Sequence, residues 1–244
     1  MRPIVLATDY GIAGPYVGQL KSAIYKISPN ALIIDLIHDL PAFNPKASAY
    51  LLASYLEHMP ENSIIVGVVD PGVGSDREPI ILEGNGFTFI GPNNGMFSIV
   101  ARKLVDIKLS KIIVTEKSVS KTFHGRDIFA PVAAKIVSNL ENKLEPLEIN
   151  KFVGTDWPDN LFEIIYIDHY GNAVTGIKLN RTFDANKVFI INDYKISYKK
   201  AFFCANENEC FWFCNSSNLL EIATKQSSAK NILKLSIGAK IKAI

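Results

Sequence analysis

The fold of the N-terminal half is indicated by the stretch Pro3-Ile4-Val5-Leu6-Ala7-Thr8-Asp9-Tyr10-Gly11. Its short apolar run ends at the turn Asp9-Tyr10-Gly11. Two more apolar runs follow at residues 31–37 and 63–69. Runs of this kind, without polar alternation, are typical of strands buried on both faces of a parallel sheet. Candidate helices at residues 15–28 and 44–59 separate them, and this order predicts right-handed crossovers. We expect an α/β, Rossmann-like domain with a mostly parallel sheet.

A hairpin and a third helix extend this domain. Pro79–Leu82 and Phe87–Ile90 flank Glu83-Gly84-Asn85-Gly86, whose turn residues favour an antiparallel hairpin. The third expected helix covers Arg126–Ser138. These elements would complete a domain of about 150 residues, which is an ordinary domain size.

The pattern changes after residue 150. Short strand-like stretches now alternate with turns, at the spacing of an all-β domain. They are Leu161–Ile167, Ala173–Leu179, Val188–Ile191, Lys195–Ser197 and Phe211–Cys214. Residues 141–159, which hold Pro146 and Pro158, are the expected linker. We therefore predict two domains: α/β over residues 1–150, and a smaller, barrel-like all-β domain over residues 159–244.

The composition is that of a folded globular protein. Of the 244 residues, 48% are hydrophobic and 20% are charged, which excludes a disordered chain. No apolar run approaches the ~20 residues of a membrane span, and the N-terminus lacks the features of a secretory signal. The three cysteines, Cys204, Cys210 and Cys214, are too few for a disulfide framework. We expect a cytoplasmic protein with no membrane partner.

The charge of the chain gives no sign of nucleic-acid binding. A formal charge of +2 leaves no basic footprint overall. Residues 195–244 carry eight Lys and three Glu, which we interpret as a solvated basic face because charge runs are usually solvated. We expect no nucleic-acid partner.

Three acidic residues, Asp9, Asp35 and Asp70, lie at or near the ends of expected strands. Ligands of parallel sheets bind beyond the carboxyl ends of the strands. An Asp at such a place is also a common turn or helix cap, so each residue alone is ambiguous. Asp35 lies inside its apolar run and is the least interpretable of the three.

The loop Val69-Asp70-Pro71-Gly72-Val73-Gly74-Ser75-Asp76-Arg77 is more informative. One Pro and two Gly build a constrained loop that lets the backbone approach a ligand closely. Asp70 and Arg77 stand at its two ends, close enough after a turn to form a pair. A surface pair would contribute little, whereas a buried one would hold the carboxylate ionised and oriented.

Of the four histidines, His124 stands out, because Thr122-Phe123-His124-Gly125-Arg126-Asp127 forms the entrance of the third expected helix. A His there is suited to acid–base work or to orienting a nucleophile. The alternative is a helix-capping or hydrogen-bonded His. His38 and His58 lie on apolar segments and are expected to be structural.

Several familiar chemistries lack their motifs. No His or Cys pair has metal-ligand spacing, and the three cysteines have no fourth ligand nearby. Phosphate-loop and dinucleotide fingerprints are missing, as is the Gly-x-Ser-x-Gly elbow of serine hydrolases. We expect no metal site and no cofactor.

Four ordered motifs resemble the S-adenosylmethionine (SAM) hydroxide adenosyltransferases, relatives of the SAM-dependent chlorinases and fluorinases. They are Thr8–Gly11 with Pro15–Gly18, Val69–Gly74 with Arg77, Phe123–Asp127, and Asp168–Asn172. The resemblance runs from about residue 4 to 240 and includes the two-domain layout. It implies that hydroxide displaces methionine from the 5′ carbon of the SAM ribose, giving adenosine. It also implies a homotrimer whose sites lie between one subunit's first domain and a neighbour's second.

The resemblance assigns the water-activating triad to Asp70, Arg77 and His124. The halogenases depart from the triad at the positions of Asp70 and His124, where a halide is held, so this sequence favours water. Water has a pKa of 15.7 and needs a proton acceptor, while the sulfonium leaving group needs no acid. The alternatives are a SAM-dependent halogenase and a SAM- or nucleoside-binding sensor without turnover.

The same resemblance implies the substrate contacts of the first domain and of the Asp168–Asn172 motif. Asp9 would accept hydrogen bonds from the ribose hydroxyls, and Tyr16 and Phe43 would bind the nucleoside. Asp168 would meet the methionine ammonium, and Asn172 would bind the adenine edge. Gly171-Asn172 is also a hairpin turn and can serve both purposes.

The resemblance also implies substrate contacts for two more stretches of the second domain. Asn215-Ser216-Ser217 falls where the family binds the methionine carboxylate; Ser216 matches, whereas Ser217 replaces an Arg of the fluorinases. Phe202 or Phe203 would stack on adenine, and membership of the β-domain core is the alternative.

Overall fold

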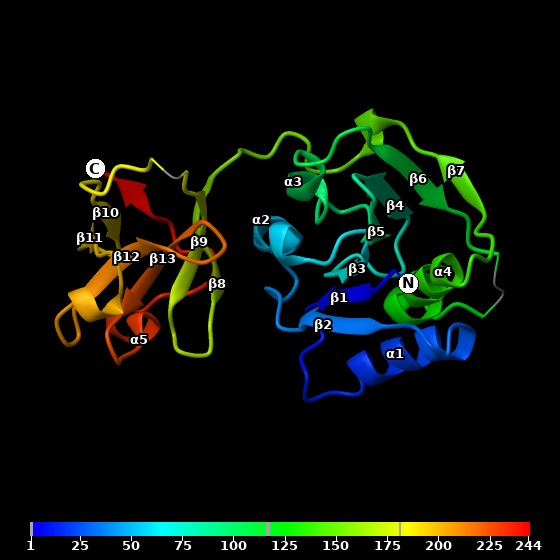
Figure 1. The fold of residues 1–244 in the computed structure, drawn as a ribbon, viewed down its shortest axis with the longest axis horizontal. Helices are drawn as coiled ribbons and strands as arrows, with labels where there is room; N and C mark the ends of the chain where they lie inside the picture. The colour runs from blue at the N-terminus through cyan, green and yellow to red at the C-terminus, as the bar shows by residue number, and fades with distance from the viewer. Residues whose placement is uncertain (1, 116–117, 181) are drawn as a thin grey trace. The chain divides into compact units, whose positions relative to one another are not determined.

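The computed structural model describes residues 2–115, 118–180 and 182–244 (Figure 1). The chain divides into two compact units, residues 1–157 and 158–244. Within the described residues, no helix is both long enough and apolar enough to cross a membrane.

The first unit is built on a mixed sheet. Its described residues form seven strands in the order β2-β1-β3-β5-β4-β6-β7. They are β1 (Ile4–Thr8), β2 (Ile33–Ile37), β3 (Ile64–Val68), β4 (Pro79–Gly84), β5 (Phe87–Pro92), β6 (Lys108–Ile112) and β7 (Leu144–Pro146). β1 is parallel to β2 and β3, and β3 is parallel to β5. β4 is antiparallel to β5 and β6, and β6 is antiparallel to β7.

The prediction of a mostly parallel, Rossmann-like sheet is therefore wrong for half of the strand pairs. The expected hairpin is confirmed, and Asn85-Gly86 joins β4 to β5 as a two-residue turn with positive φ at both residues. So short a turn connects only antiparallel strands. β6 and β7 continue the antiparallel pairing, and β7 lies inside the stretch that was expected to be a linker.

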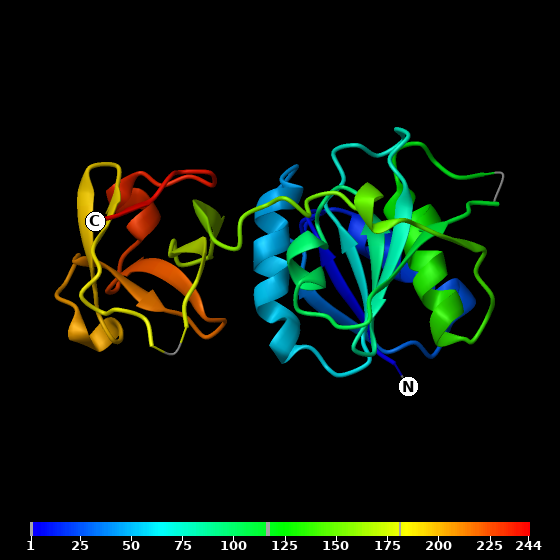
Figure 2. The ribbon, with the colours of Figure 1, turned by 90° about the horizontal axis from the view of Figure 1, so that it is seen from above.

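Helices cover both faces of this sheet. They are α1 (Tyr16–Ile27), α2 (Pro45–Tyr55), α3 (Ser98–Ala101) and α4 (Ala130–Val137). Figure 2 shows α2 on one face and α1 with α4 on the other. Leu20 and Ile24 of α1 pack with α4 against Ile4 and Leu6 of β1. The apolar spacing that predicted α1 is thus the face that it buries.

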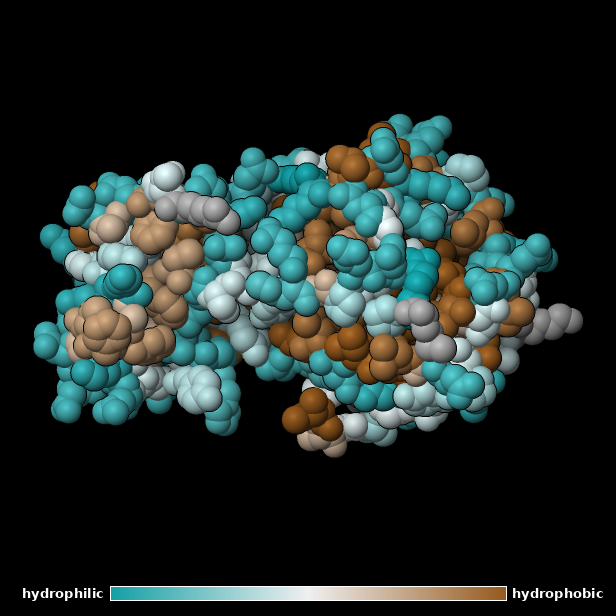
Figure 3. All heavy atoms as spheres, viewed as in Figure 1, coloured by the Kyte–Doolittle hydropathy of each residue, from teal (hydrophilic) through white to brown (hydrophobic). Residues whose placement is uncertain are grey.

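The surface of the first unit leaves large apolar side chains in solvent. Apolar atoms stand out at the loop between β1 and α1 (Figure 3), and Ile12 of that loop is 86% exposed. Phe43, in the loop before α2, is 79% exposed. Both loops follow the carboxyl ends of strands, where a ligand site was expected.

The second unit contains a curled, nearly barrel-shaped sheet (Figure 1), in the order β14-β10-β11-β12-β13-β9-β8. Its strands are β8 (Leu161–Ile167), β9 (Ala173–Lys178), β10 (Phe189–Ile191), β11 (Tyr194–Tyr198), β12 (Cys210–Cys214), β13 (Leu219–Thr224) and β14 (Lys242–Ala243). All neighbouring pairs are antiparallel except β11 with β12. The all-β prediction needs one correction, because Ser228 caps a short helix, α5 (Ala229–Leu233), whose Ala229 and Leu233 join the core.

Candidate active site

Asp9 and Asp70 meet at one edge of the first unit's sheet. β1 and β3 are parallel neighbours in which Thr8 pairs with Val68, and the Asp9 backbone N–H donates to the Val68 carbonyl at 3.3 Å. Both carboxylates therefore follow the carboxyl ends of adjacent strands, where ligands of such sheets bind.

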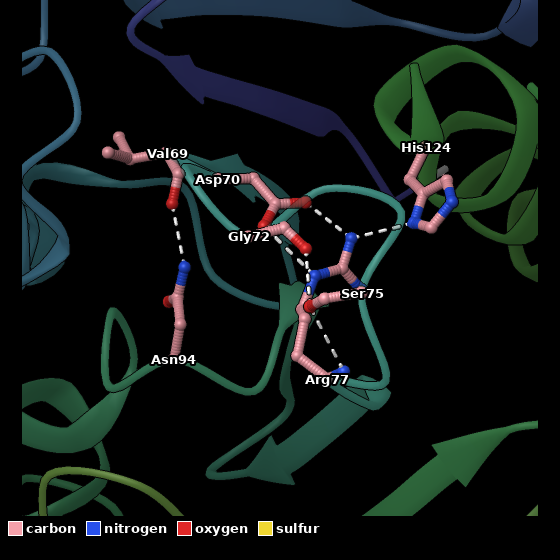
Figure 4. A network of polar contacts seen from close by, with 7 residues as sticks. All are labelled: Val69, Asp70, Gly72, Ser75, Arg77, Asn94 and His124. Atoms are coloured by element: carbon pink, nitrogen blue, oxygen red, sulfur yellow. Dashed lines mark hydrogen bonds and ion pairs between the residues drawn. The ribbon is translucent and has the colours of Figure 1, made fainter. Parts of the chain in front are cut away.

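The loop after β3 folds back and pairs its two ends (Figure 4). Asn94 Nδ2 donates to the Val69 carbonyl at 2.7 Å, which fixes the start of the loop. Arg77 Nε donates to Asp70 Oδ1 at 2.9 Å, and Arg77 Nη2 donates to Asp70 Oδ2. The side chains of Arg77 and Asp70 are only 10% and 6% exposed. The predicted pair is thus formed, bidentate and buried, which is the strong form of this interaction.

A close contact between two loops brings His124 to this pair. Gly74 has a φ of +81°, and a Cβ atom there would lie 2.3 Å from the Lys121 carbonyl oxygen. Only glycine allows the two backbones to approach so closely. His124, three residues after Lys121, then places Nδ1 2.7 Å from Arg77 Nη2 (Figure 4). The structure brings Asp70, Arg77 and His124 together as one network.

The network defines the protonation of His124. A guanidinium only donates hydrogen bonds, so Nδ1 of His124 is the acceptor. Burial lowers the pKa of His124, and the positive charge of Arg77 lowers it further. His124 is therefore neutral near pH 7, with its hydrogen on Nε2.

A cavity of about 350 Å³ opens beside Asp70 and His124. Its lining comprises Asp9, Tyr10, Tyr16, Ala42, Phe43, Val68, Asp70, Val73, Thr122, Phe123, His124 and Gly125. Tyr10, Tyr16 and Phe123 form one aromatic wall, with ring centroids 5.5 to 6.0 Å apart. An apolar wall with a few convergent polar groups is typical of a small-molecule site.

Asp9 and Phe43 hold one side of this cavity together. The Phe43 backbone N–H donates to Asp9 Oδ2 at 3.2 Å. Phe43 has a φ of +58°, a conformation that bulky residues adopt at a cost. Burial raises the pKa of the Asp9 carboxyl, while this hydrogen bond acts against the rise. The strained loop points its N–H at Asp9 and leaves the Phe43 ring in the cavity wall.

In the second unit, the Asp168–Asn172 hairpin is closed by its own side chains. Asp168 Oδ1 accepts from the Asn172 backbone N–H at 2.8 Å, and Asp168 Oδ2 accepts from Asn172 Nδ2 at 2.9 Å. Asn172 is buried. The amide oxygen of Asn172 accepts no hydrogen bond from the described part of the chain.

The Asn215–Leu219 turn is built in the same way. Asn215 Oδ1 accepts from the backbone N–H groups of Ser217 and Leu219, and Asn215 Nδ2 donates to Glu221 Oε2 at 2.9 Å. Glu221 is 9% exposed. Burial raises the pKa of Glu221; the hydrogen bond from Asn215 lowers it, and the charge of Asp168 raises it. Ser216 is exposed at the tip of this turn.

The two candidate stacking residues have different surroundings. Phe202 packs against Phe211 and Phe213, with ring centroids 5.4 and 5.3 Å away. Phe203 is largely exposed. Phe202 therefore belongs to an aromatic cluster of the second unit but is still 39% exposed, and Phe203, at 80%, is the more exposed of the two.

The remaining candidates are structural. His38 is buried between Thr8 Oγ1, 2.8 Å from Nδ1, and Asp35 Oδ1, 3.0 Å from Nε2. Asp35 also pairs with Lys21 at 2.5 Å. Among the described residues, no three His, Cys, Asp or Glu side chains group closely enough to hold a metal ion.

Three residues had no role assigned from the sequence: Tyr10 and Phe123, which form the aromatic wall with Tyr16, and Glu221. Tyr10 lines the cavity, yet only its position beside Asp9 marked it. Glu221 is the one charge in the apolar stretch Leu219-Leu220-Glu221-Ile222-Ala223, and that isolation was the signal.

The fold and the site define a two-unit α/β protein with a buried charged network at a small-molecule cavity. Family models described as the SAM hydroxide adenosyltransferase N-terminal and C-terminal domains match residues 4–145 and 162–242. The chain belongs to the SAM hydroxide adenosyltransferase family.

Individual relatives cover nearly all of the chain. A protein of Methanocaldococcus jannaschii named (R)-S-adenosyl-L-methionine hydrolase is 34% identical, over 95% of this chain and 92% of its own. One of the same name from Thermus thermophilus is 29% identical over 99% of both chains. A crystal structure of a conserved protein from Thermotoga maritima matches with a TM-score of 0.81 and 28% identity, over 98% of this chain and 99% of its own.

Proposed function

We propose that this chain hydrolyses S-adenosyl-L-methionine to adenosine and L-methionine, the activity for which its relatives are named. The observation that carries the proposal is the Asp70–Arg77–His124 network at the wall of the cavity. A buried carboxylate oriented by Arg is a fixed proton acceptor, and water needs one to become a nucleophile.

In the proposed step, the oxygen of a bound water attacks the 5′ carbon of the ribose. The C5′–O bond forms as the C5′–S bond breaks, and the electron pair of the broken bond stays on the methionine sulfur. One water proton is released to a base. Because attack by hydroxide on a sulfonium disperses charge, the apolar aromatic wall favours the reaction.

Asp70 is the proposed base. Nδ1 of His124 already accepts a hydrogen bond from Arg77, whereas each Asp70 oxygen keeps lone-pair capacity beyond its bond to Arg77. Asp70 also lines the cavity. Arg77 orients this carboxylate through two hydrogen bonds, and His124 in turn holds Arg77 in place.

The substrate contacts divide between the two units. We assign the ribose hydroxyls to Asp9 and the nucleoside walls to Tyr16 and Phe43, since all three line the cavity beside Asp70. From the second unit, we assign the methionine ammonium to Asp168 and the adenine edge to Asn172.

The contacts assigned to the turn and to the exposed rings complete this list. Ser216, exposed at its turn, would meet the methionine carboxylate. Of the two candidate stacking residues, Phe203 is favoured over Phe202, because Phe202 already packs against other rings.

The assembly and the absence of cofactors belong to the same proposal. We propose a homotrimer in which each site combines one subunit's first unit with a neighbour's second, which would cover exposed rings such as Phe43. No metal is proposed, because a sulfonium leaves without Lewis-acid help. The free thiols of Cys204, Cys210 and Cys214 fit a cytoplasmic location. Light scattering tests the trimer, which requires three times the 27.0 kDa chain mass.

The test of the activity is chromatography of purified protein incubated with SAM and chloride, with and without a chelator. Adenosine and methionine in equal amounts, unchanged by the chelator, are expected. A 5′-chloro nucleoside would identify a halogenase instead. Saturable SAM binding without any product would identify a sensor.

A further inference from the structure

We propose that Tyr10 is a further catalytic residue, whose hydroxyl donates a hydrogen bond to the attacking water. This inference rests on the proposed hydrolysis and adds a residue to it. Tyr10 follows Asp9 directly and lines the same cavity as Asp70 and His124.

The position of the Tyr10 hydroxyl is fixed by a glycine. A Cβ atom at Gly125 would lie 2.1 Å from the hydroxyl oxygen, so the hydroxyl lies against the backbone just after His124. The ring is held from the sides by Tyr16 and Phe123, at centroid distances of 6.0 and 5.5 Å. These ring contacts and Gly125 together place the hydroxyl oxygen at the edge of the cavity.

The hydroxyl is polar but unused by the protein. It makes no hydrogen bond to any residue in the described part of the chain, although a mostly buried phenol ordinarily finds a partner. Tyr10 lines the same cavity as Asp9, Asp70 and His124, and its hydroxyl lies against Gly125 at the edge of that cavity. A ligand atom between these groups would give the hydroxyl its partner.

The chemistry favours a donor at this point. Burial and the charges of Asp9 and Asp70 raise the pKa of Tyr10, so the phenol keeps its hydrogen at any working pH. A water molecule has two hydrogens and two lone pairs. If Asp70 takes one hydrogen and Tyr10 donates to one lone pair, the other lone pair is left to attack the 5′ carbon. Tyr10 therefore orients the nucleophile and takes no proton itself.

The test is Tyr10→Phe, which removes one oxygen and keeps the ring cluster. We expect kcat for adenosine release to fall about tenfold to a hundredfold, the loss typical of one hydrogen bond to a reacting group, with KM for SAM within twofold. The pH profile should keep its shape at a lower height. Tyr25→Phe, on an exposed tyrosine of α1, is the matched control and should leave kcat unchanged.

Other outcomes overturn the proposal in distinguishable ways. An unchanged kcat in Y10F removes Tyr10 from the reaction, while wild-type turnover keeps the hydrolase function intact. A raised KM with unchanged kcat places the hydroxyl on the substrate. Wild-type protein that releases no adenosine rejects both proposals. Calorimetric titration with adenosine should give wild-type affinity in Y10F; a loss of that affinity would show a damaged pocket and reject the water-orienting role.

Discussion

The network of the first unit and the hairpin of the second use polar side chains in opposite ways. Arg77 and His124 are 47 residues apart and bind each other through side chains alone. Asp168 and Asn172 are four residues apart, and Asp168 accepts from both the backbone and the side chain of Asn172. The network joins two loops and reaches the cavity through Asp70 and His124, whereas Asp168 and Asn172 close only their own turn. Substitutions in the network should change the rate, and substitutions in the hairpin should change binding and stability together.

The largest effect is expected from Asp70→Asn. The amide still accepts a hydrogen bond from Arg77 but cannot take a proton, so kcat should fall about 10³-fold. The affinity for SAM should stay within a few-fold of wild type, because Asp70 is assigned to the water. Adenosine release and calorimetric titration measure the two quantities. Unchanged turnover in D70N would remove the network from the chemistry and end the contrast with the hairpin.

The next effect is a pH dependence of kcat that arises from the protonation of His124. Burial and Arg77 lower the pKa of His124, so its Nδ1 should become protonated only below its ordinary value of 6.5. Protonation turns the acceptor toward Arg77 into a donor, and kcat should fall on the acid side at that point. In the unfolded chain His124 has its ordinary pKa of 6.5, so the unfolded state binds this proton at a higher pH than the folded state does. The free energy of unfolding should therefore decrease as the pH falls from 6.5 to the lower pKa of the folded state.

The control for this profile is His58→Asn, on a histidine away from the cavity. H58N should keep the acid limb, and His124→Asn should lose it together with about 100-fold of kcat. An acid limb that survives in H124N would assign it to another group.

Asn172→Ala tests the hairpin. It removes the Nδ2 hydrogen bond to Asp168 and should cost about 1 kcal/mol of unfolding free energy. KM for SAM should rise about tenfold at an unchanged kcat, the mark of lost uniform binding. Asn186→Ala, at an exposed turn of the same unit, is the matched control. A drop in kcat with wild-type KM would mean that the hairpin acts on the chemistry like the network.

The smallest effect is expected from Glu221→Gln. Burial and Asp168 raise the pKa of Glu221 above 4.5, so its charge destabilises the folded state at neutral pH. As the pH falls toward 4.5, Glu221 becomes protonated in the folded state and this destabilisation disappears. Gln keeps an acceptor for Asn215 without the charge. At pH 8, E221Q should have a free energy of unfolding that is higher by about 1 kcal/mol or less, seen as a slightly higher unfolding temperature. Near pH 4 it should show no gain. A loss of stability at pH 8 would mean that the charge itself holds the Asn215 turn.

Local patterns predicted much of both regions. The apolar runs that became β1 and β3 placed Asp9 and Asp70 at strand ends, and the Pro and Gly of the next loop predicted that Arg77 returns to Asp70. Each of these depends on residues close in sequence. The turn formed by Gly171-Asn172 was visible for the same reason.

The missed features depend on distant contacts. Nothing local announced β14, two residues long, or β7, because strands so short exist only through their partners. The Phe43 backbone adopts its left-handed conformation against Asp9, 34 residues away. The contact of Tyr10 with Gly125 likewise joins two ends of the first unit.

By itself, the sequence indicated two domains and the strands and helices with strong periodicity. It also offered the candidate residues for the chemistry, whose roles stay predictions. These indications follow from side-chain hydrophobicity and turn preference, which act over a few residues. The tertiary structure alone decided that β6 and β7 extend the sheet by antiparallel pairing, that Arg77 is shared between Asp70 and His124, and that the pKa of His124 is lowered. The hydrogen-bond partners of a side chain, its burial and its pKa depend on the groups around it, and only the folded chain brings those groups together.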